Sequence, residues 1–489
     1  MRLPRFTSKN QKSIFSLYHE SMPYALDIRI DRSAASTLTE QICFGILAAI
    51  RSGALAPGAR LPSWQALAAQ LGVARGTVKS AYERLADEQV IVSSRPGGTR
   101  VADHPATARV AQAAGSDAVP ELYQHLLVGS AMFQMGVPAS DCFPVSLFAR
   151  LRAHAARREV AAPAVYPDPR GESEFRREIA AHLALARGIE CRPSQIFVTA
   201  GFAGALEITL RVLRVATGAT AWMENPGFFH SRRALELAQL VSASVPVDDE
   251  GMDVAYGVEH FPNATLALVT PGQQAPLGGT LSLSRRVALI EWAARTGAWV
   301  IEDDYLGELQ LRRRAAPALA SLDGHGRVIH IGSFSKTISP SLRLGFIVAP
   351  ADLVDRFNEA VMCLGSSPGP AVQQATARFM SEGHYMRHLR RMKRVYSARG
   401  EALQIAMERK GYQVQIGGLA AIVHLPDELP DVAVAKEARA LGLAPEPLSP
   451  WFASGSVRKS GLLLGVATAD ETKLSIACEH LDHLIRQHR

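Results

Sequence analysis

Gly332-Ser333-Phe334-Ser335-Lys336 is the stretch that decides the fold of most of this chain. It follows the short apolar run 328–331, which predicts a buried strand, and the run 344–349 predicts a second strand. Lys336 therefore lies in a turn of small residues with two hydroxyl groups, where a lysine is a poor choice for packing. Desolvation lowers the pKa of such an amine, and a neutral amine can form a Schiff base. The stretch predicts a reactive lysine at a strand end.

A third predicted strand, 298–303, ends in the acids Glu302 and Asp303, and Arg343 follows the lysine turn. Together these stretches supply a lysine, a carboxylate, hydroxyl groups and a guanidinium. Pyridoxal 5′-phosphate requires this set, because a lysine binds its aldehyde, an aspartate pairs with its pyridine nitrogen, and Ser and Arg hold its phosphate. We therefore predict a pyridoxal 5′-phosphate site built on Lys336.

The 489 residues are too many for one ordinary domain, so at least two domains are expected. No apolar run is long enough to span a bilayer, and the N-terminus has no apolar signal segment, so no membrane partner is expected. The cysteines are scattered without CxxC spacing, which argues against a metal site or a disulfide framework and fits a reducing cytoplasm. They are Cys43, Cys142, Cys191, Cys363 and Cys478.

The positive charge is concentrated near the N-terminus. Residues 1–105 hold 13 Lys and Arg against 8 Asp and Glu, whereas the remainder holds 40 against 38. A basic segment of this kind indicates a polyanionic partner, and a basic solvated tail is the alternative.

Residues 34–103 have the pattern of three helices followed by a hairpin. Residues 1–33 are interpreted as a basic arm, of which 1–21 either are disordered or precede the true start. Helical spacing predicts a first helix over 38–52, Ser63 is a good N-cap for a second, and a third is expected over 75–86. An extended segment, 89–93, then leads to a glycine-rich hairpin tip. This order predicts a winged helix-turn-helix.

The outer face of the third helix carries Arg75, Thr77 and Lys79, which suit a major groove of double-stranded DNA. The wing carries Arg95 and Arg100, which suit phosphate or minor-groove contacts. The alternative, a structural helical cap on an enzyme, does not explain a basic outer face.

The stretches Ser52–Ser63, Leu67–Val73 and Arg75–Val78 resemble the GntR family of bacterial regulators. The resemblance covers about residues 36–102. It implies that Arg60 and Ser63 touch DNA together with Arg75, Thr77 and Lys79. One departure is Ala74, which stands where the family usually has a capping serine and leaves the third helix without that cap.

Residues 104–120 are rich in Ala, Gly, Ser and Pro and predict a linker. From residue 121 to 489, apolar strands alternate with amphipathic helices, which indicates an α/β domain with a parallel sheet. Helices and short strands beyond about Tyr385 indicate a smaller C-terminal lobe.

The large domain resembles the fold type I aminotransferase superfamily along nearly its whole length. Seven short motifs occur in the family's order, and any one alone would be weak. Joined to a GntR-type head, the chain resembles a MocR/GabR-type transcriptional regulator. The motifs are Tyr166–Gly171, Thr199–Gly201, Glu224–Gly227, Thr270-Pro271, Glu302–Tyr305, Ser333–Lys336 and Ser341–Gly345.

The resemblance implies roles for individual residues. Lys336 would form the internal aldimine, Asp303 would keep the pyridine nitrogen protonated, and Tyr305 would donate to the ring oxygen. The spacing of Asp303 and Lys336 matches the family. Asp304 is interpreted as a solvated or structural acid. The remaining implied cofactor contacts are Ser333, Ser335 and Arg343 with the amides near Gly201 at the phosphate, Phe228 stacked on the ring, and Tyr166 at the phosphate of a neighbouring subunit.

The motifs also depart from the family. Phe228 replaces the usual tyrosine, and His230 stands where amino-acid-sensing relatives can have an arginine. The stretch 461–466, where relatives place an arginine for a substrate carboxylate, has none, and Arg458 is the nearest guanidinium in sequence. A carboxylate site without its bidentate partner loses affinity. The expected effector is therefore an unusual amine or pyridoxal 5′-phosphate itself.

Three functions are compatible with these patterns. The first is a cytoplasmic bacterial regulator that acts as a head-to-tail homodimer on a promoter operator, with a small-molecule effector. The second is an aminotransferase with an accessory DNA-binding head. The third, a scaffold with a vestigial cofactor fold, is disfavoured because Lys336, Asp303 and Arg343 are all present. The sequence does not give the effector, the operator or the sign of regulation.

Overall fold

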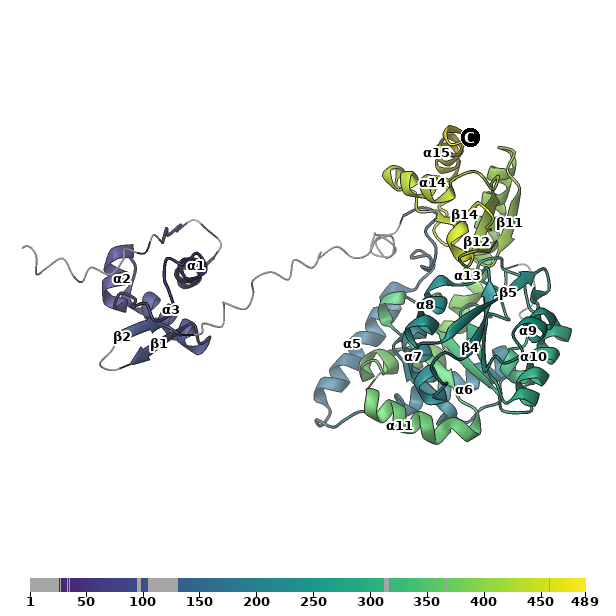
Figure 1. The fold of residues 1–489 in the computed structure, drawn as a ribbon, viewed down its shortest axis with the longest axis horizontal. Helices are drawn as coiled ribbons and strands as arrows, with labels where there is room; N and C mark the ends of the chain where they lie inside the picture. The colour runs from purple at the N-terminus through teal and green to yellow at the C-terminus, as the bar shows by residue number, and fades with distance from the viewer. Residues whose placement is uncertain are drawn as a thin grey trace, which may run out of the picture. The chain divides into compact units, whose positions relative to one another are not determined.

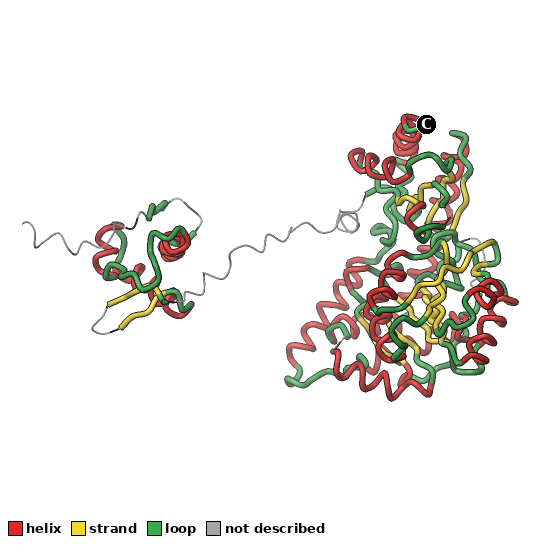
Figure 2. The backbone as a smooth tube through the Cα atoms, in the orientation of Figure 1, coloured by secondary structure: helices red, strands yellow, loops and turns green. Residues whose placement is uncertain are grey.

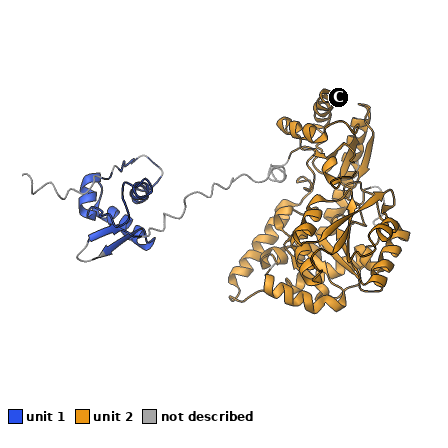
Figure 3. Ribbon diagram, in the orientation of Figure 1, with its two compact units in different colours: residues 1–121 blue, residues 122–489 orange. Residues whose placement is uncertain are grey.

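The computed structural model describes residues 26, 28–32, 34, 36–94, 98–103, 131–311, 316–365, 367–456 and 458–489. The chain divides into two compact units, Met1–Glu121 and Leu122–Arg489 (Figure 3). Most of the expected basic arm, the expected linker 104–120 and Arg95 lie outside the described residues. No helix in the described part is both long and apolar enough to cross a membrane.

The first unit has three helices and a two-stranded hairpin. The sequence patterns predicted all three helices, α1 (Leu38–Arg51), α2 (Trp64–Leu71) and α3 (Arg75–Asp87). Ser63 caps α2 by accepting from the Ala66 amide at 3.1 Å, whereas α3 begins at Ala74 without a side-chain cap, as expected. The strands β1 (Ile91–Ser94) and β2 (Gly98–Val101) pair antiparallel and form the wing.

An eight-stranded sheet forms the centre of the second unit. Its order is β3-β10-β9-β8-β7-β4-β5-β6. The strands are β3 (Ile196–Thr199), β4 (Thr220–Asn225), β5 (Val241–Asp248), β6 (Gly251–Met252), β7 (Leu266–Val269), β8 (Trp299–Asp304), β9 (Val328–Ser333) and β10 (Gly345–Val348).

The expected parallel sheet is found for β5, β4, β7, β8 and β9, which pair parallel with one another in that order, whereas β6 pairs antiparallel with β5. β10 runs antiparallel to both β9 and β3, so the sheet is mixed. The reason is the short connection from Ser333 to Gly345, which contains the lysine turn. A parallel crossover needs a dozen or more residues, usually with an α-helix. This connection is shorter, and its helical segment is only the three-residue 3-10 helix Pro340–Leu342.

Helices cover both faces of this sheet (Figure 1). On one face, Ile301 and Ile329 pack in a core with α7 (Gly201–Leu213), α8 (Phe229–Leu237) and α11 (Val354–Leu364). On the other face, Val300 and Val328 pack in a core with α9 (Val254–His260) and α10 (Leu283–Thr296). The helices α5 (Val145–Ala161), α6 (Ser173–Arg187) and α12 (Pro370–Ser381) pack together beside the sheet.

The C-terminal lobe begins with the long helix α13 (His384–Glu408), close to the expected boundary at Tyr385. Its antiparallel sheet has the order β11-β12-β14-β13, which Figure 2 shows in yellow beside its helices. Residues 131–136 join this lobe, since the Gly465 amide donates to Phe133 O at 2.7 Å. The elements are β11 (Val414–Gly417), β12 (Ala420–His424), β13 (Glu446–Pro447), β14 (Gly461–Gly465), α14 (Asp431–Ala438) and α15 (Leu474–Gln487).

Candidate cofactor site and nucleic-acid interface

The acids at the end of β8 face opposite sides of the sheet, because side chains alternate along a strand. Ile301 packs in the core under α7, and Asp303 follows on that same face. Glu302 and Asp304 therefore face the other side. The motif therefore places a single carboxylate, Asp303, on the sheet face that α7 covers, next to the end of β9.

Asp303 is a buried acid that lacks a hydrogen-bond partner at one oxygen. Its side chain is buried, and Oδ1 has no partner among the described residues. Burial raises the pKa of Asp303 well above its usual range, the charges of Asp304 and Glu224 raise it further, and Lys336 opposes them. An unpartnered buried acceptor costs free energy unless a ligand satisfies it. Asp303 therefore fits the protonated ring nitrogen of a bound pyridine.

Lys336 follows the end of β9, as the sequence predicted. Its Nζ donates to Gly136 O at 2.9 Å. Burial lowers the pKa of the Lys336 amine, whereas the carboxylates of Glu446 and Asp303 raise it. A lowered pKa makes it easier to form the free base, which is the form of the amine that attacks an aldehyde.

Four further predicted residues lie at the same sheet edge. Gly201 begins α7 with a φ of 79°, and a Cβ there would lie 3.7 Å from Arg343 Cζ. Arg343 Nη2 donates to Ala200 O at 3.0 Å, and Ser333 Oγ accepts from the Ser335 amide at 3.2 Å. A helix N-terminus, a guanidinium and two hydroxyls form a set that can bind a phosphate.

Glu224, from the Glu-Asn-Pro-Gly motif, is fully buried beneath this site. Thr270 donates to it from its amide at 3.1 Å and from Oγ1 at 2.5 Å, and Gln274 Nε2 lies 3.4 Å away. Burial raises the pKa of Glu224 to about 7, although these hydrogen bonds lower it. The Glu224 carboxyl group thus links the Glu224–Gly227 motif to the Thr270-Pro271 motif.

Tyr305 and Phe228 lie in one apolar cluster with Trp451 and Leu463 of the C-terminal lobe. The ring centroids of Phe228 and Trp451 are 5.7 Å apart. Burial raises the pKa of the Tyr305 hydroxyl, so it stays a proton donor. The cluster therefore brings both predicted ring contacts to one place.

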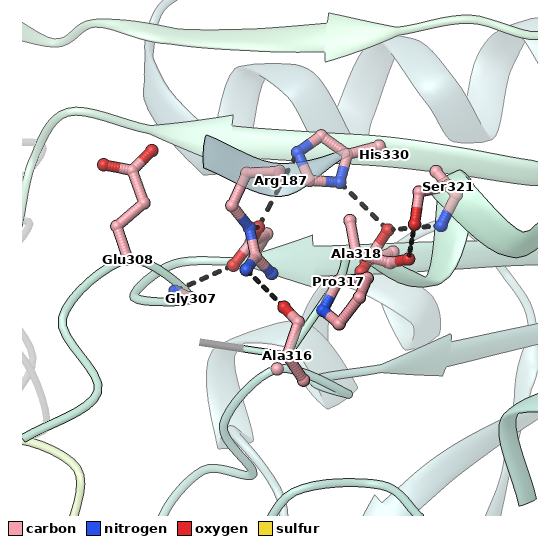
Figure 4. Close-up of polar contacts among 12 residues, drawn as sticks. Arg187, Gly307, Glu308, Ala316, Pro317, Ala318, Ser321 and His330 are labelled. Carbon is pink, nitrogen blue, oxygen red and sulfur yellow. Dashed lines mark hydrogen bonds and ion pairs between the residues drawn. The ribbon is translucent and has the colours of Figure 1, made fainter. Parts of the chain in front are cut away.

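Asp304 is a structural acid, and it is not solvated. Arg187 Nε donates to its Oδ2 at 2.7 Å, with the two side chains 1% and 7% exposed. Figure 4 shows Arg187 also reaching the Ala316 carbonyl, at 2.6 Å, and His330 beside it. His330 Nδ1 donates to Glu302 at 2.9 Å. This network lies on the face of β8 opposite Asp303 and fixes the strand end.

Tyr166 is the one predicted cofactor contact that this chain does not bring to the site. Its side chain is fully exposed, and Val160 and Val165 beside it are also exposed. The position is compatible with a role in a second subunit, which the sequence interpretation gave it.

The predicted DNA contacts lie on the outside of the first unit. Ser63, Arg75 and Lys79 are exposed, and Thr77 is half-buried. The backbones of Arg60 and Arg100 form an isolated antiparallel β-bridge, and Arg100 Nη1 donates to Gly58 O at 3.0 Å. These residues therefore lie at the N-terminus of α2, at the start of α3 and in the wing. The structure does not describe Arg95.

Sequence reasoning missed several groups at the cofactor site. Glu446 interacts electrostatically with Lys336, and Gly136 O accepts a hydrogen bond from Lys336 Nζ. Gln273 Oε1 and Trp451 Nε1 are buried without a partner among the described residues, and Arg232 Nη2 donates to Trp451 O at 3.2 Å. An acid between two prolines, Pro445-Glu446-Pro447, is the one sequence signal that could have drawn attention to this strand.

Comparison with known families supports the division of the chain. Residues 38–101 match the family of bacterial regulatory proteins of the GntR type, and residues 147–458 match the aminotransferase class I and II family. Among solved structures, LysN, the α-aminoadipate aminotransferase of Thermus thermophilus, superposes with a TM-score of 0.68 at 26% identity, covering 75% of this chain and 95% of LysN. That structure holds N-(5′-phosphopyridoxyl)-L-leucine.

Full-length relatives combine both parts. The probable rhizopine catabolism regulatory protein MocR of Rhizobium meliloti is 34% identical over 90% of this chain and 92% of its own length. The pyridoxine biosynthesis transcriptional regulator PdxR of Corynebacterium glutamicum is 32% identical over 93% and 96%. The chain therefore belongs to the MocR-type family of HTH transcriptional regulators, in which a GntR-type winged helix is joined to an aminotransferase-like domain.

Proposed function

We propose that this regulator binds pyridoxal 5′-phosphate covalently at Lys336 and reads an amine effector at the same site. Bound there, the cofactor supplies an electrophilic aldehyde carbon. Asp303 would hold its ring nitrogen, and Tyr305 its ring oxygen. Its phosphate would lie among Ser333, Ser335, Arg343 and the amides near Gly201, and Phe228 would cover the ring.

The observation that carries this proposal is the unpartnered Oδ1 of Asp303 on the sheet face that holds Lys336. A buried acid that only packs would have a protein partner, as Asp304 has in Arg187. The acid on the reactive face instead awaits a donor, and the pyridinium N–H is such a donor.

The DNA-binding part of the proposal rests on the exposed basic groups of the first unit. Arg60, Ser63, Arg75, Thr77 and Lys79, with Arg100 of the wing, would contact a promoter operator. The operator-bound form would be a homodimer with a head-to-tail arrangement, in which Tyr166 of each chain reaches its neighbour's phosphate site. An effector regulates such a protein only if it binds two conformations with different affinity.

The visible absorption spectrum of the purified protein with added pyridoxal 5′-phosphate tests the cofactor assignment. We expect a pH-sensitive band in the wild type and in Lys473→Ala, an exposed-lysine control, and its absence in Lys336→Ala. The same band in Lys336→Ala, or no band in any of the proteins, would remove the covalent chemistry from Lys336.

A second candidate function is transamination. The free amine of Lys336, its lowered pKa and Asp303 are what a half-reaction needs from the protein. Steady-state assays with several amino donors separate the two functions. Sustained turnover would make the chain an enzyme with a DNA-binding head, whereas a spectral change without turnover supports a regulator.

A further inference from the structure

Glu446 is an acid of the effector site that the proposed cofactor roles leave unused. It lies in β13, and its partner in the register is Leu463 of β14. Directly paired residues on antiparallel strands project their side chains to the same face of the sheet. Leu463 packs in the apolar cluster with Phe228, Tyr305 and Trp451. Glu446 therefore lies on the face of this sheet that packs against the predicted ring contacts.

The charge of Glu446 acts on the reactive centre. It raises the pKa of the Lys336 amine, and burial raises the pKa of Glu446 itself to about 7. A lysine engaged with an aldehyde is no longer free as an ammonium ion. The half-buried Glu446 carboxyl then lacks the cation that opposes its desolvation, and a desolvated carboxylate is costly without one.

Two polar side chains near this apolar cluster have buried atoms without partners in the described part of the chain. Gln273 Oε1 is a buried acceptor and Trp451 Nε1 a buried donor, and neither has a hydrogen-bond partner among the described residues. The Trp451 indole lies close enough to lower the pKa of Glu446 without forming a hydrogen bond of good geometry. The acceptors Glu446 and Gln273 Oε1 accompany this apolar cluster, as do two buried donors without a partner among the described residues, Trp451 Nε1 and Arg232 Nε. The two acceptors suit the N–H groups of a ligand.

A carboxylate-bearing ligand fits this space poorly. All five residues of β14 are buried, and none carries a charge. Arg458, the nearest guanidinium in sequence, is exposed. Arg232 donates from Nη2 to Trp451 O, and its buried Nε has no partner among the described residues. A ligand carboxylate near Glu446 would meet a like charge instead of a guanidinium, and such juxtaposition lowers affinity.

We propose that Glu446 binds the far end of the effector and that the effector is a diamine. One amine reacts at the aldehyde carbon over Lys336, and the second, as a cation, pairs with the Glu446 carboxylate. In the reaction one C–N bond forms and the bond to the lysine breaks. Lys336 leaves as the free amine, and no electrons are exchanged. The inference rests on the proposed function, since it needs the cofactor in place.

The test titrates the holoprotein with three amines of equal carbon-chain length and follows both heat and the absorption band. They are putrescine, n-butylamine and γ-aminobutyrate. We expect putrescine to bind at least about tenfold more tightly than the other two, because only it supplies a second cation to Glu446. In Glu446→Gln this preference disappears, whereas Glu428→Gln, an exposed acid of the same lobe, keeps it.

Besides the absence of any putrescine preference, two results would overturn the inference. One is tighter binding of γ-aminobutyrate than of putrescine, which would make Arg232 the effector's partner instead. The other is an unchanged preference in Glu446→Gln. If that variant does not fold, the ranking of the three amines in the wild type still decides. A holoprotein band with no putrescine preference refutes this inference alone, whereas a missing band refutes the proposed function as well.

Discussion

Asp303 and Asp304 are neighbours in β8, yet Asp304 pairs with Arg187 on one side of the sheet while Asp303 lies near Lys336 on the other. Two adjacent acids of identical chemistry therefore do separate work. One holds the strand end in place, and the other stays without a protein partner at Oδ1. Substituting each in turn separates cofactor binding from stability.

Asp303→Asn is expected to weaken binding of pyridoxal 5′-phosphate by about 1.5–3 kcal/mol, because the amide offers no charge to the ring nitrogen. The free energy of unfolding of the apoprotein should not fall, since the amide is cheaper to bury than the acid. Absorption titration gives the affinity, and Asp249→Asn, on an exposed turn, is the control. Unchanged affinity would contradict the assignment of Asp303 to the ring.

Asp304→Asn is expected to lower the free energy of unfolding and to leave cofactor binding unchanged. It leaves Arg187 buried without its ion-pair partner, which costs about 3–5 kcal/mol of unfolding free energy. Urea unfolding measures the loss. The double variant Arg187→Met with Asp304→Asn should recover part of it, since the buried charge is gone. Cofactor affinity of the folded fraction stays close to that of the wild type if Asp304 is structural.

Glu224 makes stability depend on pH. Its pKa is raised from 4.5 to about 7, so the folded chain binds the extra proton between these values. Stability therefore falls as pH rises through this window. Relative to the wild type, Glu224→Gln should gain on the order of 3 kcal/mol between pH 4 and pH 8. Urea unfolding across this range checks it against Glu190→Gln, an exposed acid, and equal pH profiles for the two variants would refute it.

Arg75→Ala should weaken operator binding by about 1–3 kcal/mol, and Lys79→Ala should lower the salt slope by about one unit. Arg84 is the matched control on the same helix. It lies nine positions after Arg75, which is two and a half helical turns and places it on the opposite side. Gel retardation at several salt concentrations distinguishes them. If Arg84→Ala weakens binding as much as Arg75→Ala, α3 does not present this face to DNA.

Tyr166→Phe should weaken cofactor binding by about 1.5–3 kcal/mol in the dimer, because it removes a hydrogen bond to a charged phosphate. At dilutions where the chains separate, the wild type and the variant should bind equally, since Tyr166 is exposed within its own chain. Titration at two protein concentrations tests this, with Tyr256→Phe as the control. A loss that is independent of protein concentration would place Tyr166 outside any intersubunit site.

Local patterns in the sequence were enough for the elements and for the reactive strand ends. The spacing of apolar residues gave α1, α2 and α3, and Ser63 is the cap that its position predicted. Lys336 and Asp303 could be found because each directly follows a short apolar run, and because the family resemblance supplied their roles. Both kinds of signal lie within a few residues of the groups they identify.

Glu446, Trp451 and Gly136 could not be found in this way. Glu446 and Trp451 reach the site only through the C-terminal lobe, where β13 pairs with β14, and Gly136 meets Lys336 through the docking of residues 131–136 onto that lobe. Such long-range contacts leave no periodic signal. The direction of β10 was missed for a related reason, because the apolar pattern of a buried strand is the same whichever way it runs.

The hydrogen bond from Lys336 to Gly136 joins the reactive amine to the first described segment of the large unit, the stretch through which the chain continues back toward its DNA-binding end. An amine taken up by an aldehyde gives up that free ammonium donor. A hydrogen bond from a charged group contributes about 1.5–3 kcal/mol, which corresponds to a factor of roughly 10 to 150 in an equilibrium constant. The chemical state of the Lys336 nitrogen can thus alter how firmly residues 131–136 dock onto the large unit. The chemical state of Lys336 and the docking of residues 131–136 are therefore linked in one equilibrium.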